Sequence, residues 1–238
     1  MSVPLNPFTH PLYYLHSHYR FEGKRSWQAC DFYAADGHML LRAEVAGIPG
    51  DIPVRPADGD EPWLWLRPRP KFVVNGRYDA HDARSGEHLG ILERGGRILD
   101  AQEHPVALIA DPATLGDRLK EGAINALVDA ALSMGEGRAA GHRADELQLH
   151  AGGRLIGLCR RTDLPFAPRT AVDLQGFSPK RWLGSVLPAR AADAIASATR
   201  PSGWRIEFTG DTDDRLDPRL RLAAVLLRIE IERRYQSA

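Results

Sequence analysis

Residues 217–235 read DPRLRLAAVLLRIEIERRY, and this pattern predicts a helix. Asp217 suits the N-cap, because its carboxylate can accept hydrogen bonds from the free amides of the first turn. Pro218 suits the first helical position, where its missing N–H is not needed. In residues 220–231 apolar side chains occupy almost every angle around the axis, whereas a surface helix keeps one polar face. We therefore expect a central helix over residues 217–236 that is surrounded by protein.

The apolar part of this helix is too short to cross a membrane. Arg221 and Arg228 bracket only six uninterrupted apolar residues, whereas a bilayer span needs roughly 20. A core helix is therefore favoured over a membrane anchor, and we expect no transmembrane span.

Most of the remaining chain has the pattern of short strands joined by tight turns. Aromatic and β-branched runs, separated by turns such as Asp36-Gly37 and Ser85-Gly86, predict antiparallel hairpins. The expected strands are 12–19, 27–34, 39–45, 63–66, 71–75, 77–80, 88–93, 97–101, 106–110, 146–150, 155–160, 171–174, 181–187 and 204–208. The run 47–62 is predicted to be a surface loop, because its Gly, Pro and Asp residues interrupt helices and strands alike.

Three further segments depart from the strand pattern. Residues 112–132 carry apolar side chains at the three-and-four spacing of an amphipathic helix, and a Gly-rich loop follows to residue 143. A short Ala-rich helix is predicted at 189–198. Residues 1–10, which include Pro4 and Pro7, are expected to form an extended arm.

About a dozen short strands and one helix that is apolar on all sides have few ways to pack together. A flat sheet covers only one side of such a helix, whereas a closed sheet covers every side and has no free edge. The sequence therefore predicts a mainly β fold, a closed antiparallel barrel of about 12 strands around the hydrophobic C-terminal helix. Residues 1–238 are expected to form one domain, with 112–143 as an inserted helix and loop.

Composition narrows the class of partner. The chain has 31 basic and 31 acidic residues, so we expect no nucleic-acid partner, and any anion site must be local. Cys30 and Cys159 are too few for a disulfide framework, and the N-terminal residues lack the profile of a secretory signal. The expected compartment is a reducing cytoplasm, with a single bridge between the two cysteines left open.

Two segments together resemble a known superfamily. FVVNGRYDAHDARSGEHLGILERGGRILDAQEHPVALIAD (72–111) and LDPRLRLAAVLLRIEIERR (216–234) are similar to the Tubby C-terminal-like superfamily, which includes phospholipid scramblases and plant LURP-one-related proteins. The similarity lies in a rhythm of strand, D-x-x-t-G, strand and D-x-x-g, matched by Asp82 with Gly86 and by Asp100. It also lies in a closing hydrophobic helix introduced by Leu216-Asp217.

The resemblance implies a 12-stranded barrel around a central helix. It also implies a non-enzymatic binding module, which engages phospholipid headgroups at a membrane surface, or another anionic partner, through basic residues on the barrel wall. Scramblases carry a Pro-rich N-terminal segment and a palmitoylated cysteine cluster, and this chain has neither. The resemblance therefore does not extend to membrane anchoring or lipid flipping.

The acidic segment before the last helix of scramblases has a counterpart in residues 210–217, GDTDDRLD. Asp211, Asp213 and Asp214 could offer oxygen ligands to calcium. An EF-hand-like loop would need Gly and Glu where this chain has Leu216 and Leu222. The simpler interpretation is that acidic residues are favoured near a helix start, and no other cofactor is expected.

Basic residues supply the candidate anion site on the barrel wall. Those of the run 67–71 alternate, so an extended segment would project them to one side, where two further basic pairs could join them. The candidate residues are Arg67, Arg69, Lys71, Arg160, Arg161, Lys180 and Arg181. Pro68 and Pro70 fit a solvated loop equally well.

Catalytic motifs of the common hydrolase, NTPase and metalloprotease classes do not occur in the chain. An unusual enzyme stays open. The alternatives to the wall-binding module are a structural or protein-interaction module, and a small-ligand protein or enzyme with its site at the barrel mouth. Against the last, the helix is expected to fill the lumen and to leave no cavity.

Overall fold

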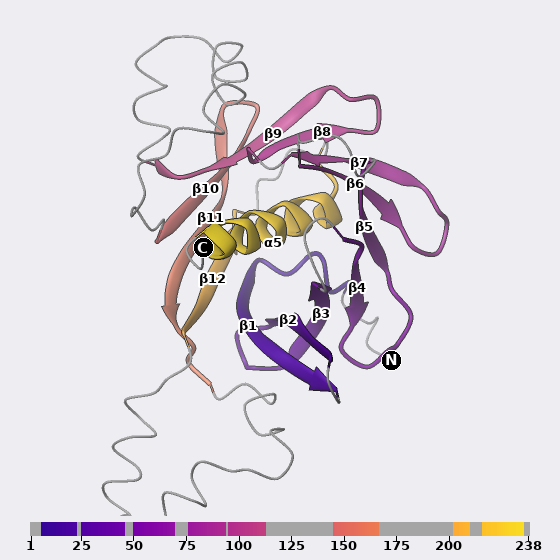
Figure 1. Cartoon of the computed structure of the whole chain (residues 1–238). Coiled ribbons are helices and arrows are strands. Elements are labelled where there is room, and N and C mark those ends of the chain that lie inside the picture. The colour runs from indigo at the N-terminus through magenta and orange to yellow at the C-terminus, as the bar shows by residue number, and fades with distance from the viewer. Residues whose placement is uncertain are drawn as a thin grey trace, which may run out of the picture.

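The structure of the protein, a computed structural model, describes residues 6–22, 25–45, 50–69, 76–93, 95–112, 145–166, 202–209 and 216–235. Side chains are described for all of these except 19–22, 25–27 and 231–235. Twelve antiparallel strands close into one barrel, in the spatial order β1-β12-β11-β10-β9-β8-β7-β6-β5-β4-β3-β2 (Figure 1). One helix, α5 (Pro218–Tyr235), follows the last strand. The predicted mainly β barrel with a C-terminal helix is confirmed.

Every strand of the barrel pairs with the strands that precede and follow it along the chain, and β12 pairs with β1 to close the ring. The strands are β1 (Leu12–Glu22), β2 (Arg25–Tyr33), β3 (Met39–Val45), β4 (Ile52–Pro56), β5 (Leu64–Pro68), β6 (Arg77–Asp82), β7 (His88–Glu93), β8 (Arg97–Asp100), β9 (Pro105–Ala110), β10 (Glu146–Ala151), β11 (Arg154–Asp163) and β12 (Ser202–Phe208).

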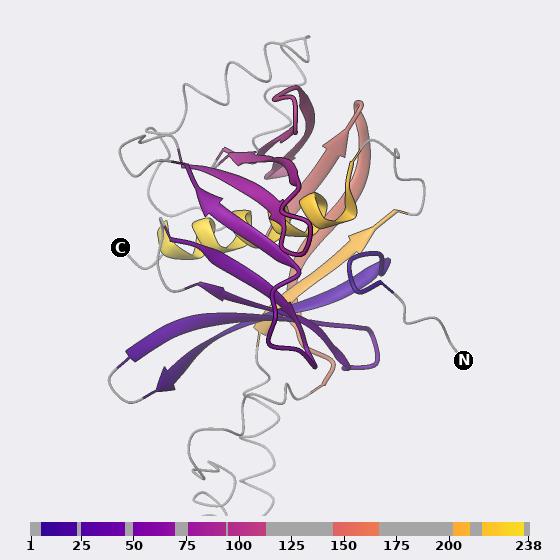
Figure 2. The same ribbon diagram turned by 90° about the vertical axis from the view of Figure 1, so that its right-hand side faces the viewer.

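Helix α5 runs through the middle of the barrel, as two perpendicular views show (Figures 1 and 2). All side chains from residue 220 to residue 227 are buried, which agrees with the absence of a polar face in the sequence. The cap forms as expected: Asp217 Oδ1 accepts a hydrogen bond of 2.7 Å from the Arg219 amide. The helix is thus enclosed by the strands.

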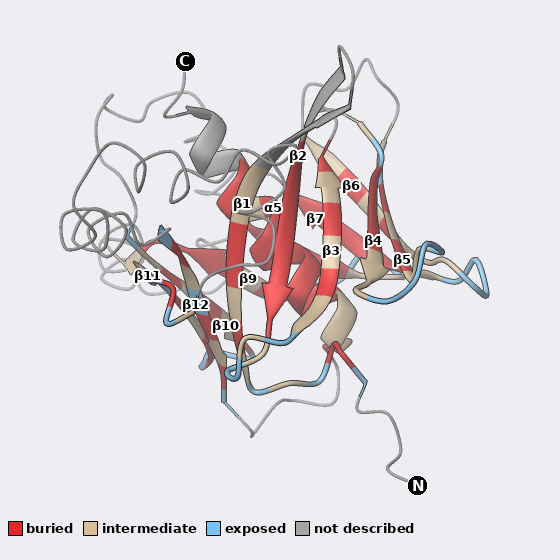
Figure 3. Ribbon diagram, turned by 90° about the horizontal axis from the view of Figure 1, so that it is seen from below, coloured by how far each residue is buried: buried red, intermediate tan, exposed pale blue. Residues whose placement is uncertain are grey.

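Strand residues alternate between the lumen and the outer wall. In β3, Leu41, Ala43 and Val45 are buried and the residues between them are partly exposed, a pattern visible as alternating colours along the strand (Figure 3). Close packing against the helix shows at Gly90 of β7, where an added Cβ would lie 2.9 Å from Leu220 Cδ1. The core therefore consists of inward strand residues packed on α5.

The prediction of a surface loop over residues 47–62 is wrong for Ile52–Pro56, which form β4. Ile52 and Val54 are 0% and 2% exposed and pair with Leu66 and Leu64 of β5. Proline removes one amide donor, but its fixed φ is compatible with an extended chain. Burial of two apolar side chains outweighs that loss. The strand was not predicted because the run is rich in Pro and Gly.

Several expected elements lie outside the described residues. These are the strands 71–75, 171–174 and 181–187, the short helix 189–198 and nearly all of the insertion 112–143. The arm 1–10 is not extended in its described part, because the Thr9 amide donates to the Asn6 carbonyl at 3.0 Å and closes a turn. Cys30 and Cys159 are both buried and both free, so the single disulfide left open by the sequence is absent.

Candidate functional site

Several segments meet at the end of the barrel where α5 begins. Antiparallel strands alternate in direction, so the β4–β5 link and the β6–β7 turn lie at the same end as the start of β1. These segments and the first residues of α5 border an open pocket of about 460 Å³. Its lining residues are Asn6, Pro7, Phe8, Trp63, Asp82, Arg84, Asp217, Pro218 and Arg219. The prediction concerned the lumen, which α5 occupies. The pocket lies outside the lumen, at the barrel mouth, and its volume is in the range that small ligands occupy.

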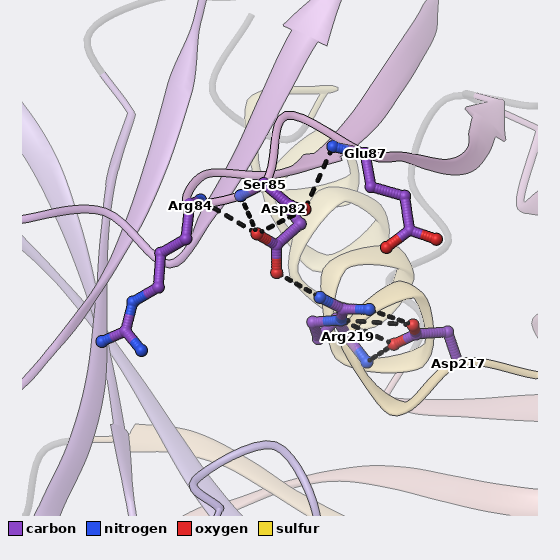
Figure 4. A network of polar contacts seen from close by, with 6 residues as sticks. All are labelled: Asp82, Arg84, Ser85, Glu87, Asp217 and Arg219. Carbon is purple, nitrogen blue, oxygen red and sulfur yellow. Dashed lines mark hydrogen bonds and ion pairs between the residues drawn. The ribbon is translucent and has the colours of Figure 1, made fainter.

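The Asp82 carboxylate organises the β6–β7 turn (Figure 4). Its Oδ1 accepts hydrogen bonds from the Arg84 amide at 2.9 Å and from the Ser85 amide at 2.8 Å. The turn closes where the Gly86 amide donates to the Asp82 carbonyl at 3.0 Å. Gly86 has a φ of +73°, which explains the glycine in the D-x-x-t-G motif.

Arg219 connects this turn to the helix. Its guanidinium donates to Asp82 Oδ2 through Nη1 and to Asp217 Oδ2 through Nη2 at 2.6 Å. The hydrogen bond from the Ser85 amide, with those from the Ser85 hydroxyl and the Arg84 amide and the charge of Arg219, lowers the pKa of Asp82. Asp82 is consequently ionised at neutral pH. The network holds the β6–β7 turn against the start of α5.

Arg84 points away from this network (Figure 4). Its guanidinium carbon lies 4.7 Å from the ring centre of Trp63, a cation–π contact. The side chain is exposed, and no carboxylate among the described residues pairs with it. Arg84 is thus a cation on the pocket wall whose N–H donors have no carboxylate partner among the described residues.

The apolar wall of the pocket combines the N-terminal arm with Trp63 of the β4–β5 link. Phe8 is only 2% exposed, and its ring centre lies 6.3 Å from that of Trp63. Asn6 Oδ1 accepts from the Phe8 amide at 3.0 Å, and the Tyr13 hydroxyl donates to the Pro7 carbonyl at 2.8 Å. The first bond closes a turn within the arm, and the second connects the arm to β1.

The predicted wall residues Arg67 and Arg69 lie together on the outer face at β5. The Arg67 guanidinium stands 5.4 Å from the ring centre of Trp65 and is exposed. Arg69 pairs with Asp79 and with Glu103, each at 2.9 Å. The hydrogen bonds from Arg69 to Asp79 and Glu103 raise its pKa. The positive charge of Arg69 is therefore already balanced by two carboxylates.

Arg160 and Arg161 lie on β11, and five strands separate β11 from β5 in either direction around the barrel. Arg160 pairs with Glu146 at 2.9 Å. One headgroup could not reach both basic pairs, so the structure does not bring these candidates together. The remaining candidates, Lys71, Lys180, Arg181 and the acidic Asp211, Asp213 and Asp214, lie outside the described residues.

The sequence interpretation missed four residues that build the pocket: Phe8, Trp63, Arg84 and Arg219. Asp82, Gly86 and Asp217 stood out as motif positions, but only as features of turns and helix starts. The two arginines each lie within two residues of such an aspartate, which was the one available signal. Their convergence depends on barrel closure, which joins residue 82 to residue 217.

No described helix is both long enough and apolar enough to cross a membrane. Within the described ranges no group of three or more His, Cys, Asp or Glu side chains could hold a metal ion. Comparisons with family models, with curated proteins and with solved structures find no match to this chain.

Proposed function

We propose that the protein is a non-enzymatic binding module of the Tubby-like kind. It takes a small ligand with an acidic group, a carboxylate or a phosphate, into the pocket at the barrel mouth. The observation that carries the proposal is Arg84, which makes a cation–π contact with Trp63 at the edge of a 460 Å³ pocket and pairs with no described carboxylate.

The cation–π contact is compatible with an anionic partner for Arg84. The indole ring attracts the guanidinium, and the guanidinium N–H groups can form a bidentate pair with a carboxylate or a phosphate. Trp63, which is partly exposed, then offers apolar surface to the body of the ligand. Basic residues on the wall support the proposal less, because Arg69 and Arg160 already have carboxylate partners.

Isothermal titration with 3-phenylpropanoate, which joins a carboxylate to an apolar body, tests the proposal. Arg84→Gln removes the charge and should weaken binding about tenfold or more, since a hydrogen bond to a charged group contributes roughly 1.5–3 kcal/mol. Arg84→Lys should lose part of the affinity, because an ammonium keeps the charge but not the bidentate geometry.

Arg67→Gln is the matched comparison, because Arg67 also makes a cation–π contact with an indole, that of Trp65, but does not line the pocket. It should leave the affinity within about twofold, the effect of an outer-wall change. Loss of binding in Arg67→Gln with none in Arg84→Gln would place the site on the wall and overturn the pocket proposal.

The acidic group can belong to a free molecule or to a lipid headgroup. Co-sedimentation with phosphatidylcholine vesicles, with and without phosphatidic acid, separates these sources. Binding only to the anionic vesicles, and its loss in Arg84→Gln, would identify a headgroup; equal binding to both vesicles would remove that claim. A cytoplasmic location stays part of the proposal. It is supported by the two free cysteines, because disulfides are rare in the reducing cytoplasm.

A further inference from the structure

Two histidines of β1 form a stacked pair on the outer wall of the barrel. Tyr13 and Leu15 of the same strand are fully buried core residues. Because side chains alternate along a strand, His16 and His18 lie on the opposite, outer face. Their ring centres are 5.3 Å apart, and the ring planes meet at only 15°. A charge on one imidazole is therefore felt by the other.

The stacked pair lies beside a buried carboxylate on the next strand. Asp31 of β2 is the cross-strand partner of His16 and is 0% exposed. Its Oδ2 lies 3.8 Å from His18 Nδ1, and its Oδ1 accepts a hydrogen bond of 2.7 Å from Arg42 Nε of β3. The negative charge beside the histidines thus already has one cationic partner.

The other titratable and charged groups described on the neighbouring strands are also engaged. Tyr33 of β2 donates to the same carboxylate at 3.4 Å. Two ion pairs lie on the strands to either side, Glu44 with Arg55 on β3 and β4, and Arg205 with Glu207 on β12. Each of these glutamates has an arginine partner, so neither is free to balance a second imidazolium.

His16 is the member of the pair that resists a proton. It is 8% exposed, and its Nδ1 has no hydrogen-bond partner in the described part of the chain. Burial lowers the pKa of His16, and the charge of Asp31 opposes this only in part. With His18 already protonated, a proton on His16 would place two like charges 5.3 Å apart, beside the guanidinium of Arg42.

From this arrangement we infer that the histidine pair is an acid-sensitive contact, which tolerates one proton and loosens β1 from β2 when both imidazoles are protonated. The unfolded chain takes up both protons near pH 6.5, roughly the ordinary value for histidine. Below that pH the unfolded state binds more protons than the folded state, so the folded wall loses stability as the pH falls. Neither histidine lines the pocket, so the inference does not rest on the proposed function.

Nuclear magnetic resonance titration of the histidine Cε1–Hε1 signals of the full chain tests whether the two rings compete for protons. The titration midpoint of His16 should lie below that of His38, which is exposed. His18→Phe keeps a ring in the stack but cannot be charged, so in this variant the midpoint of His16 should rise by about 0.5 pH units or more. An unchanged midpoint would overturn the inference.

Thermal unfolding at about pH 7.5 and about pH 5.5 tests the effect on stability. Wild type should lose about 2–4 °C more in unfolding temperature between these pH values than His16→Phe, which cannot take the second proton. His38→Phe is the matched control and should keep the wild-type loss. His16→Gln removes the same charge and replaces His16→Phe if the larger ring prevents folding. A loss as large as that of wild type in the His16 variant would show that acid acts elsewhere, and the inference would fail.

Discussion

At the scale of single residues, Asp82 should make the stability of the folded protein depend on pH. Its pKa is lowered in the folded state, so its contribution is complete above the unfolded pKa of about 3.9 and is lost as pH falls through the folded value. Asp82→Asn should therefore unfold at lower temperature than wild type near neutral pH, and the difference should narrow below about pH 4. Thermal unfolding followed by circular dichroism measures it. A difference that stays constant down to about pH 3 would contradict this assignment.

The burial of charged residues inside the barrel could not be predicted from the sequence. Arg221 is 6% exposed and lies 4.0 Å from the ring centre of Phe208. Glu230 is fully buried, and its Oε1 accepts from the Ser17 hydroxyl at 2.9 Å across 213 residues of sequence. No local pattern marks such a pair, because only the closed barrel brings β1 beside the last turns of the helix.

At the scale of elements, the helix was predictable because its signal is local: an N-cap, a proline and apolar residues at all angles. Leu226 is 1% exposed within it, so Leu226→Ala should lower the free energy of unfolding by about 2–5 kcal/mol through lost burial and a residual cavity. Leu155, which is 43% exposed, is the matched control, and Leu155→Ala should change it by no more than about 0.5 kcal/mol. Urea denaturation of both variants checks this; equal effects would mean that α5 is not enclosed.

Strand β4 shows where local signals fail. Two of its five residues are prolines, and composition therefore favoured a loop, although Ile52 and Val54 are buried and pair with β5. Pairing with both β3 and β5 stabilises the extended conformation that the composition does not predict. The pocket could not be predicted from local signals either, since its residues come from the N-terminal arm, the links between strands and the start of α5, which the ring of strands brings together.

At the scale of the whole molecule, enclosure of the helix was the step that led from sequence to fold. A helix without a polar face requires cover on all sides, and a closed barrel of short strands provides it. The barrel needs the helix in turn, because without α5 the inward side chains of twelve strands would face water. The pocket depends on the same arrangement, because one wall is the start of α5.

Deletion of residues 217–238 tests this mutual dependence most directly. The shortened chain should be insoluble, or should lack the near-ultraviolet circular dichroism of packed aromatic side chains, because domain stability of about 5–15 kcal/mol cannot absorb the loss of the central core. A truncated protein that stays soluble and unfolds cooperatively on heating would contradict the account.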